Sequence, residues 1–439
     1  MKVLPRGARK KILLTRLISA VRRRVSNASA RMVSPKAITS LSRLLSRGEA
    51  KTAFSSVAVN NARSIVVVRQ DTIGDLVLMS PFLRELRRSN PSAWISLVVD
   101  AKFRNLVELC PHVNEILGFD LACRGRAVDP RLVFRALRLS RRQLRPRRFD
   151  LALLPRWDVD FYHSAYVAYF SGARYRIGYS EHVTQLKRAM NRDFDLLFTS
   201  TLDDCACRHE AERNLDLLRA AGVAVEDNQT ELWLSDEDRE TARRALSSHG
   251  LTPGNLIIGL GLGAGEPKRV WPLSRFIELA RTLQTEYGAR FVAVGGPEDR
   301  DRGSRLTMEL GRDAVNLAGD LTLRQTAALF ESTQLAITND SGPMHLAAAA
   351  GTAVLEISCH PSSGDLNHRN SPVRFHPWAK EYAMAQPVEA SEPCVSGCES
   401  RDAHCILGVS VGMVQQAARR LLANHRRGKI VQGGVQSAT

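Results

Sequence analysis

Runs of apolar residues alternate with segments of helical periodicity through most of the chain. Residues 65–68 are four branched aliphatics, and a polar turn separates them from Leu76, Met79, Leu83 and Leu86, which are spaced for one face of a helix. Similar runs predict further buried strands with helices between them. Such βαβ units require a parallel sheet with right-handed crossovers. The strands predicted in the first half are 65–68, 93–100, 150–155 and 175–180.

The second half of the chain repeats this plan. Its first predicted strand leads into a glycine-rich turn, and an acidic, polar stretch near residues 226–238 suits a linker between the halves. We therefore expect two doubly wound, Rossmann-like α/β domains that face each other across a cleft. The further strands are predicted at 256–265, 290–299, 314–319, 335–342 and 353–358, and the expected domains are 61–230 and 231–425, with an extension at 1–60 and a tail at 426–439.

Length and composition agree with a soluble protein of two domains. A chain of 439 residues is too long for one ordinary domain, and 44% of its residues are hydrophobic. The eight cysteines are scattered, which favours a reducing compartment over a disulfide framework. No apolar run approaches the roughly 20 residues that a membrane-spanning helix needs.

The net charge of +17 is concentrated at the amino terminus. Residues 1–60 hold 14 Lys or Arg against the single acid Glu49, which gives +13 and leaves +4 for the rest of the chain. Within them, KKILLTRLISAVRRR places apolar residues at helical intervals between clusters of cations. A basic amphipathic helix of this kind binds an anionic membrane surface, and each cation contributes about 1 kcal/mol.

Two other interpretations of this extension stay open. A basic arm also suits nucleic acid, but the extension has no aromatic residue before Phe54 on which bases would stack. A stretch rich in Arg and Ser and poor in acids is also typical of a cleaved targeting peptide. We expect an anionic membrane surface as the partner, and no nucleic acid.

The first predicted strand ends in the turn QDTIGD. Gly74 permits a sharp turn, and Asp75 follows it at the carboxyl end of the strand, where open α/β sheets bind their ligands. Asp75 is therefore a candidate catalytic residue. Because Asp is also a favoured helix cap, a purely structural role stays open.

Three motifs in the second half are suited to a nucleotide. GLGAGEPKR supplies glycines whose backbone N–H groups reach phosphate, followed by Lys268, although the turn is not a P-loop and a structural role is equally compatible. TNDSGPMHLAAAAGTAV opens a helix at Ser341 and places His345 in the first turn of that helix, which makes an anion-binding site. The alternative is that the polar residues only cap the helix and that His345 is a core histidine. Glu298 follows a strand and two glycines, where its carboxylate could accept hydrogen bonds from ribose hydroxyls. The alternative is that it only belongs to a turn.

A known family resembles three of these stretches, namely VVRQDTIGDLVLMSPFLRELR, PKRVWPLSRFIELA and above all TNDSGPMHLAAAAGTAV. It is the ADP-heptose:lipopolysaccharide heptosyltransferases, glycosyltransferase family 9, and the likeness covers about residues 63–424. The resemblance implies a GT-B fold with the acceptor on the first domain and the nucleotide sugar on the second. It further implies Asp75 as the catalytic base. The implied donor-binding residues are Gly263, Lys268, Glu298, Asp340, Ser341, Gly342 and His345, and the acceptor-binding residues are Arg69 and Thr72.

The reaction implied by this resemblance is an inverting, metal-independent transfer without a cofactor. A heptose or related sugar passes from a nucleotide-diphosphate sugar, expected to be ADP-heptose, to a lipopolysaccharide core or a similar anionic glycolipid. The protein is then expected in the cytoplasm, at the inner face of the inner membrane. The alternatives are a sugar-nucleotide epimerase of the same fold, which needs no acceptor, and a non-catalytic nucleic-acid-binding protein that uses the extension.

The chain departs from the family in two places. Residues 1–60 are not a standard part of it, and Gly263 to Gly265 stand where the family usually has a Thr or Ser pair, so that hydroxyl contacts to phosphate become backbone contacts.

Near the carboxyl end, Cys394, Cys398, His404 and Cys405 stand close together. Their spacing is compatible with zinc, but an adjacent His-Cys pair is an awkward chelate. A structural role is favoured, and no metal site is predicted.

Overall fold

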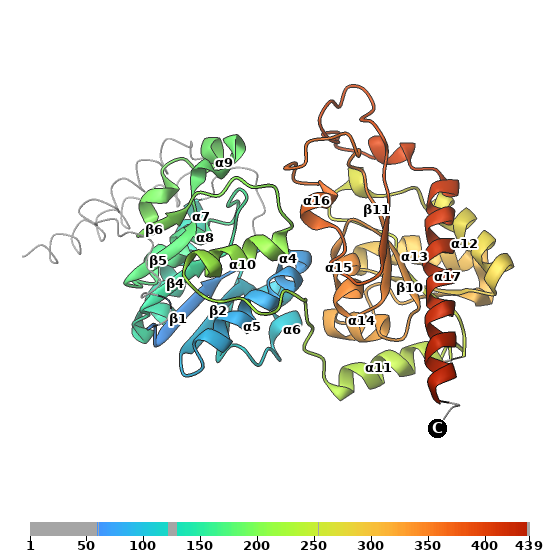
Figure 1. Ribbon diagram of the computed structural model, residues 1–439, viewed down its shortest axis with the longest axis horizontal. Coiled ribbons are helices and arrows are strands. Elements are labelled where there is room, and N and C mark those ends of the chain that lie inside the picture. The colour runs from blue at the N-terminus through green and yellow to red at the C-terminus, as the bar shows by residue number, and fades with distance from the viewer. Residues whose placement is uncertain (1–58, 60, 122–129, 253, 437–439) are drawn as a thin grey trace, which may run out of the picture.

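The first half of the chain folds into a six-stranded parallel sheet in the order β3-β2-β1-β4-β5-β6 (Figure 1). This is the strand order of a doubly wound nucleotide-binding fold. The structure is a computed structural model that describes residues 59, 61–121, 130–252 and 254–436. The amphipathic helix expected near the amino terminus lies outside these residues. The strands are β1 (Ser64–Val68), β2 (Trp94–Asp100), β3 (Glu115–Phe119), β4 (Leu151–Leu154), β5 (Tyr175–Tyr179) and β6 (Ser200–Leu202).

The second half repeats this topology. Its six-stranded sheet has the order β12-β11-β10-β7-β8-β9, which is again 3-2-1-4-5-6 when the strands are counted from the first of that half. Each pair of neighbouring strands is parallel in both sheets, as the βαβ pattern predicts. The strands are β7 (Ile257–Gly261), β8 (Arg290–Val294), β9 (Ala314–Asn316), β10 (Leu335–Asn339), β11 (Ala353–Ile357) and β12 (Tyr382–Ala385).

All nine strands predicted from the sequence are present, but the pattern missed three. These are β3, β6 and β12, which lie at edges of the two sheets. An edge strand is covered less than a central one, so it does not need a continuous apolar run. All three residues of β6 are only half-buried, and Tyr382 of β12 is exposed.

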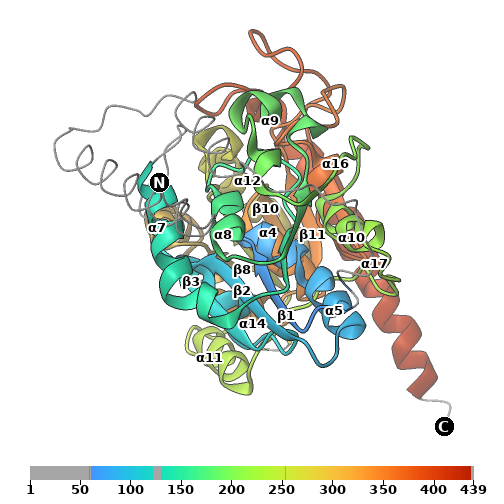
Figure 2. The same ribbon diagram turned by 90° about the vertical axis from the view of Figure 1, so that its left-hand side faces the viewer.

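Helices cover both faces of each sheet. In the first domain, α4, α5, α6 and α10 pack on one face and α7 and α8 on the other; in the second, α11, α14 and α15 pack on one face and α12, α13 and α17 on the other (Figures 1 and 2). The bounds are α4 (Ile73–Leu78), α5 (Ser80–Ser89), α6 (Arg104–Val107), α7 (Pro130–Leu139), α8 (Ser164–Phe170), α9 (Gln185–Met190), α10 (Glu210–Ala220), α11 (Asp236–Ser247), α12 (Leu273–Tyr287), α13 (Arg300–Leu310), α14 (Leu323–Phe330), α15 (Gly342–Ala349), α16 (Pro372–Phe375) and α17 (Val411–Gln436).

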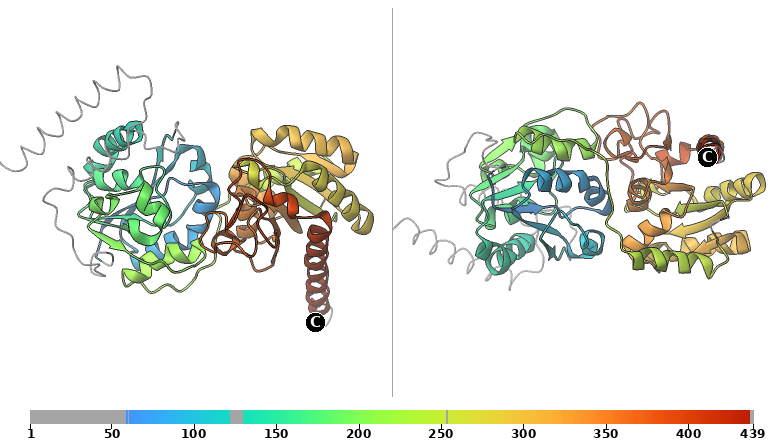
Figure 3. Two further views of the ribbon diagram at one scale, coloured as in Figure 1. Left: turned by 90° about the horizontal axis from the view of Figure 1, so that it is seen from above. Right: turned by 60° about the horizontal axis from the view of Figure 1, so that its bottom comes forward.

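The carboxyl-terminal helix α17 includes most of the residues expected to form the tail. A tail is expected from residue 426, whereas α17 runs on to Gln436 and extends beyond the body of the second domain (Figure 3). Among the described residues, no helix combines the length and the apolar character that crossing a bilayer requires.

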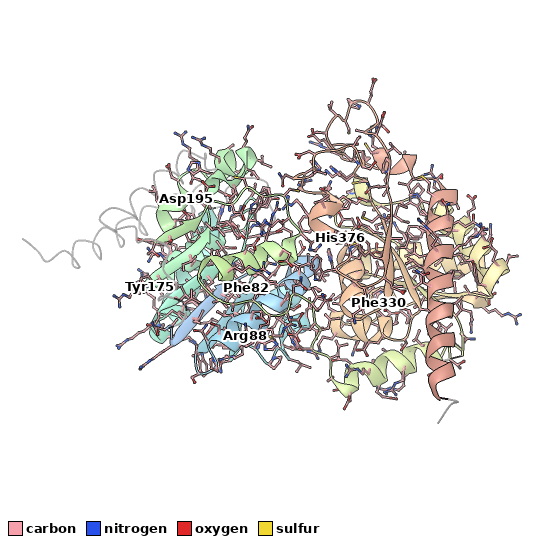
Figure 4. All side chains as sticks on the ribbon, viewed as in Figure 1. Phe82, Arg88, Tyr175, Asp195, Phe330 and His376 are labelled. Atoms are coloured by element: carbon pink, nitrogen blue, oxygen red, sulfur yellow. The ribbon has the colours of Figure 1, made fainter. Side chains whose placement is uncertain are left out.

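One hydrophobic cluster continues from the first domain into the second. It joins the α4–α5 face of the first sheet to α14 and α15, so that Phe82 of α5 and Phe330 of α14 belong to the same buried cluster (Figure 4). Within this cluster, α4 and α15 approach each other closely. A Cβ atom on Gly74 would lie 2.3 Å from Cδ2 of His345, and one on Gly342 would lie 2.9 Å from Cδ1 of Ile73.

Ion pairs, both buried and partly exposed, also tie the domains together. Arg374 of α16 is fully buried and donates to Glu210 of α10 over 2.7 and 2.9 Å and to Asp158 over 2.9 Å. Its guanidinium lies over the ring of Trp157, with 4.9 Å between the guanidinium carbon and the ring centroid. On another side of the interface, Arg324 of α14 pairs with Glu108.

We expect Arg374→Met to destabilise the protein strongly. The methionine removes the hydrogen bonds to Glu210 and Asp158 and leaves the buried Glu210 with Arg213 as its remaining cation. Removing one partner of a buried pair costs up to about 3–5 kcal/mol. Urea unfolding followed by circular dichroism measures the loss. The matched control is Arg281→Met, because Arg281 pairs with Glu309 while both side chains are more than half exposed. It should change stability by less than about 1 kcal/mol. Equal losses for the two variants would contradict the role of Arg374.

Candidate active site

The predicted site residues follow strands that flank the switch point of each sheet. In the first sheet the strand order reverses between β1 and β4, and in the second between β7 and β10. Ligands of doubly wound sheets bind outside the carboxyl ends of the strands at such points. Asp75 follows β1, Gly263 follows β7, and Asp340 follows β10. The two switch points are brought together by the contact of α4 with α15.

Asp75 lies in the first turn of α4 and is held at both oxygens. Its Oδ2 accepts hydrogen bonds from the backbone N–H of Thr72 over 3.1 Å and from Oγ1 of Thr72 over 2.8 Å. Its Oδ1 accepts from Nη2 of Arg69 over 2.9 Å. The carboxylate thus caps the helix, and 16% of its side chain is still exposed. Capping and chemistry are therefore compatible at this position.

Arg69 is placed differently from its sequence-based prediction. The sequence predicts an acceptor contact, whereas the side chain is only 1% exposed and engaged by protein groups. Its Nε lies 2.7 Å from Oδ2 of Asp71, and its Nη1 donates to the backbone oxygen of Pro155 and to Oδ1 of Asn214. In this arrangement Arg69 orients Asp75 and has no face free for a sugar.

A second arginine completes this network, and the sequence analysis missed it. Arg156, directly after β4, pairs with Oδ1 of Asp71. Asp71 thereby lies between Arg69 and Arg156, and the ends of β1 and β4 are joined across the switch point. The sequence feature that could have indicated Arg156 is its position directly after a predicted strand, which is also the position of Arg69.

Lys268 of the glycine-rich turn is buried with a partner. It lies in the 3₁₀ turn η6 (Pro267–Arg269), its side chain is 7% exposed, and its Nζ is 3.2 Å from Oε2 of Glu266. Glu266 also accepts two bonds of 2.8 Å from Arg369. These two cations and their shared acid are therefore assembled at the end of β7.

Gly263 is packed closely against a side chain. A Cβ atom there would lie 1.9 Å from Oδ1 of Asp299, so a larger residue would have to displace this carboxylate. Burial raises the pKa of Asp299 above its usual range. Glu298, the acid predicted for ribose, lies in the adjacent turn η7 (Pro297–Asp299) and is exposed. Of the two neighbouring acids, Asp299 supports the turn and Glu298 is available to a ligand.

Asn339 at the end of β10 holds the glycine-rich turn in place. Its Oδ1 accepts from the backbone N–H of Trp271 over 3.0 Å, and its Nδ2 donates to the backbone oxygens of Gly261 and Gly263 over 3.3 and 3.2 Å. The next residue, Asp340, is buried, and its Oδ2 lies 3.2 Å from Nη1 of Arg269. The turn after β7 and the start of α15 are thus one hydrogen-bonded unit.

His345 lies buried in the first turn of α15. Burial is the main reason that its pKa falls to about 4, and the charges of Asp340 and Asp75 only partly oppose this. The ring is therefore neutral at neutral pH and offers a ligand one N–H rather than a positive charge. Ser341 precedes the helix as its N-cap, and its hydroxyl donates to the backbone oxygen of Asn339.

Glu356 is a further buried acid that the sequence analysis missed. It lies in β11 beside Thr338 of β10 and is 1% exposed. Burial, together with the neighbouring charge of Asp340, raises its pKa well above the usual range. The sequence feature that could have indicated this residue is a glutamate inside an otherwise apolar strand.

The structure thus brings most of the predicted site residues to one region between the sheets. Asp75 and Thr72 come from the first domain, and Asp340, Ser341, Gly342 and His345 face them from the second. Gly263, Lys268 and Glu298 follow β7 and β8 at the same edge of the second sheet. Arg69 is buried behind Asp75.

Comparison with known proteins identifies the family of the chain. A sequence profile of glycosyltransferase family 9 (heptosyltransferase) matches residues 137–399. Lipopolysaccharide heptosyltransferase 2 of Salmonella typhimurium is 28% identical over 326 residues, which are 71% of this chain and 88% of that protein. Lipopolysaccharide heptosyltransferase 2 of Escherichia coli is 28% identical over the same shares.

Solved structures show the same fold. A family 9 glycosyltransferase from Veillonella parvula superposes with a TM-score of 0.67 at 24% identity, covering 82% of this chain and 98% of that one. The E. coli ADP-heptose lipopolysaccharide heptosyltransferase II superposes with a TM-score of 0.61 at 22% identity, covering 83% and 99%. The GT-B arrangement of two Rossmann-like domains is thereby confirmed. The profile spans more than half of the chain, and the protein therefore belongs to glycosyltransferase family 9, the heptosyltransferases.

Proposed function

We propose that the protein transfers a heptose from ADP-heptose to a lipopolysaccharide core or a similar glycolipid, with inversion at the anomeric carbon and without a metal ion in the reaction. The observation that carries the proposal is the placement of Asp75, in the first turn of α4, against the amino-terminal turn of α15. The names of the two enzymes called lipopolysaccharide heptosyltransferase 2 support the acceptor, and the name of the E. coli heptosyltransferase II structure supports the donor.

Asp75 acts as the general base in this proposal. The acceptor hydroxyl attacks the anomeric carbon from the side of the first domain, and its proton passes to the Asp75 carboxylate. A carbon–oxygen bond forms to the acceptor while the bond to the diphosphate breaks, and the electron pair leaves with the diphosphate. Attack opposite the leaving group inverts the anomeric centre.

The second domain stabilises the leaving diphosphate. Lys268 and Arg269 supply positive charge, and the start of α15 adds the backbone N–H of Gly342 and the positive end of the helix dipole. Neutral His345 contributes a hydrogen-bond donor. Lys268 and Arg269 are paired with Glu266 and Asp340, so the diphosphate competes with these carboxylates for the cations.

The remaining predicted residues have supporting roles. The exposed Glu298 accepts hydrogen bonds from the ribose of the donor, and Gly263 offers backbone groups to the phosphates. The Thr72 hydroxyl contacts the acceptor next to Asp75. Arg69 positions Asp75 through the bond to Oδ1 and does not contact the acceptor.

We also propose that the enzyme works at the cytoplasmic face of the inner membrane. A lipid-anchored acceptor is presented there, and the +13 charge of residues 1–60 raises the concentration of the enzyme at an anionic surface. Leu13, Leu17 and Val21 would enter the interface while Lys10 and Lys11 meet lipid phosphates.

We expect Asp75→Asn to lower kcat by about a hundredfold or more, the usual scale of general base catalysis. The amide keeps an acceptor for the cap but cannot take the proton. Steady-state assays with ADP-heptose and a core acceptor measure the effect.

The control for this variant is Asp238→Asn. Asp238 caps α11 in the same way, since its Oδ2 accepts from Ser235 over 2.8 and 3.0 Å, and it also pairs with an arginine, Arg324. A loss of kcat in Asp238→Asn as large as in Asp75→Asn would assign the effect to capping and sink the general-base role.

We expect Lys268→Met to weaken ADP binding by about ten- to a hundredfold, because a hydrogen bond to a charged group contributes about 1.5–3 kcal/mol. His345→Ala should weaken binding less, since the ring is neutral. Isothermal titration calorimetry with ADP measures both. The controls are Lys102→Met and His249→Ala, which change exposed side chains. Unchanged ADP affinity in Lys268→Met and His345→Ala would refute the proposed phosphate site.

Deleting residues 1–58 should release the protein from anionic vesicles and leave activity on a soluble, delipidated acceptor largely intact. The deletion stops before Val59, which is buried in the core. Binding of the full-length protein should weaken with salt, because screening shortens to about 8 Å at physiological ionic strength. Vesicle co-sedimentation measures this. Equal binding with and without the segment would argue against the membrane role.

A further inference from the structure

A long segment near the carboxyl end is ordered without helix or strand. It comprises residues 386–404, between β12 and the 3₁₀ turn η9 (Cys405–Gly408). Irregular segments of this length are uncommon in compact domains, and those that are not linkers usually have a function. Cys394, Cys398 and His404 belong to the segment, and Cys405 follows it directly.

The four side chains converge on one point. Nδ1 of His404 lies 3.7 Å from Sγ of Cys394 and 3.4 Å from Sγ of Cys405. One ligand atom from each of the four residues lies within 4.8 Å of the others. Zinc bonds of about 2.3 Å to sulfur and about 2.0–2.1 Å to nitrogen in a tetrahedron place S and N about 3.5–3.6 Å apart. The two observed separations between sulfur and nitrogen are close to this value.

The cluster is buried and is not a disulfide. Cys398 and Cys405 are fully buried and Cys394 is 9% exposed, and all three are free thiols. A single buried cysteine behaves as a small apolar residue. Three thiols that surround one imidazole are instead a set of metal ligands.

The chemical type of the four ligand atoms indicates which metal they bind. Three thiolates and one imidazole are soft and borderline ligands, and this set contains no carboxylate that would favour Mg²⁺ or Ca²⁺. A closed Cys₃His tetrahedron is a common structural zinc site. The adjacent His-Cys pair is no obstacle, because the backbone at His404 (φ −141°, ψ −90°) lets the ring and the Cys405 sulfur reach the same point.

We propose that Cys394, Cys398, His404 and Cys405 bind one zinc ion in a closed structural site. Four protein ligands leave no coordination position for substrate, so the ion takes no part in sugar transfer. The sequence favoured a structural role without metal, and the convergence of the four ligand atoms is what changes this interpretation.

The site would fix the segment against the donor-binding half of the enzyme. Directly after Cys405, the backbone oxygen of Val409 accepts from Nε1 of Trp271 over 2.8 Å and from Nη1 of Arg275 over 2.7 Å. Trp271 is two residues beyond the η6 turn that carries Lys268. Before it, the backbone oxygen of Ser396 accepts from the N–H of Asp365. The zinc tetrahedron thereby supports the Lys268 turn from behind.

The test measures metal content, which does not depend on sugar transfer. The full chain, purified without chelators, should contain about one zinc per molecule by inductively coupled plasma mass spectrometry. Exchange with Co²⁺ should produce the intense visible bands of a tetrahedral site and thiolate charge-transfer absorption.

Variants assign the ligands. Cys398→Ser and His404→Ala should each lose most of the zinc and the Co²⁺ bands. Cys110→Ala is the matched control, because it removes a buried thiol from a different hydrophobic cluster and should keep the metal. Cys359→Ala tests a neighbour of the site, because the Cys359 thiol shares a hydrogen bond with Cys398, and it should also keep the metal. Cys205→Ser controls for exposed thiols.

Three outcomes would overturn the proposal. They are full-length protein that is free of metal and gives no tetrahedral Co²⁺ spectrum, a disulfide among Cys394, Cys398 and Cys405 found by mass spectrometry, and iron in place of zinc. Loss of zinc in Cys359→Ala but not in His404→Ala would overturn the ligand assignment.

Discussion

The contact between α4 and α15 is the constraint on which the site depends. Gly74 and Gly342 are each packed so closely against the opposite helix that a methyl group would collide with His345 or Ile73. Because both positions lack a side chain, two helices from different domains approach at their amino-terminal turns. This approach places Asp75 within electrostatic range of His345, and so joins an acid of one half to the anion-binding turn of the other.

Polar and apolar interactions hold this contact from different sides. A hydrophobic cluster continues from the first sheet through α4 and α5 into α14 and α15, so the domains share part of a core. Around it, Arg374 reaches Glu210 and Arg324 reaches Glu108 across the interface. A buried ion pair contributes little over an apolar pair of the same size, but it specifies which surfaces meet, since an unpaired buried charge is costly. The geometry of the two domains is thereby determined by charge and shape together.

The cations of the second domain are balanced before any donor binds. Lys268 pairs with Glu266, and Arg269 pairs with Asp340. In these pairs the carboxylates compensate the buried positive charges. The oxygens of a bound diphosphate can take the place of the carboxylates. In the first domain, Arg69 and Arg156 both pair with Asp71. This pairing keeps Arg69 beside Asp75. Paired buried charges thus prepare both halves of the site.

The sequence by itself determined the periodic and local features. The aliphatic run of β1, the glycine turn after β7 and the opening of α15 each depend on neighbours in the chain, so the central strands, the double-domain plan and Asp75 were predictable. The edge strands β3, β6 and β12 were not, because a half-covered edge tolerates polar residues. Only the tertiary structure decided that Arg69 and Glu356 are buried and that three cysteines meet His404. The physical reason is that burial and side-chain distances between separate elements depend on how the whole chain packs.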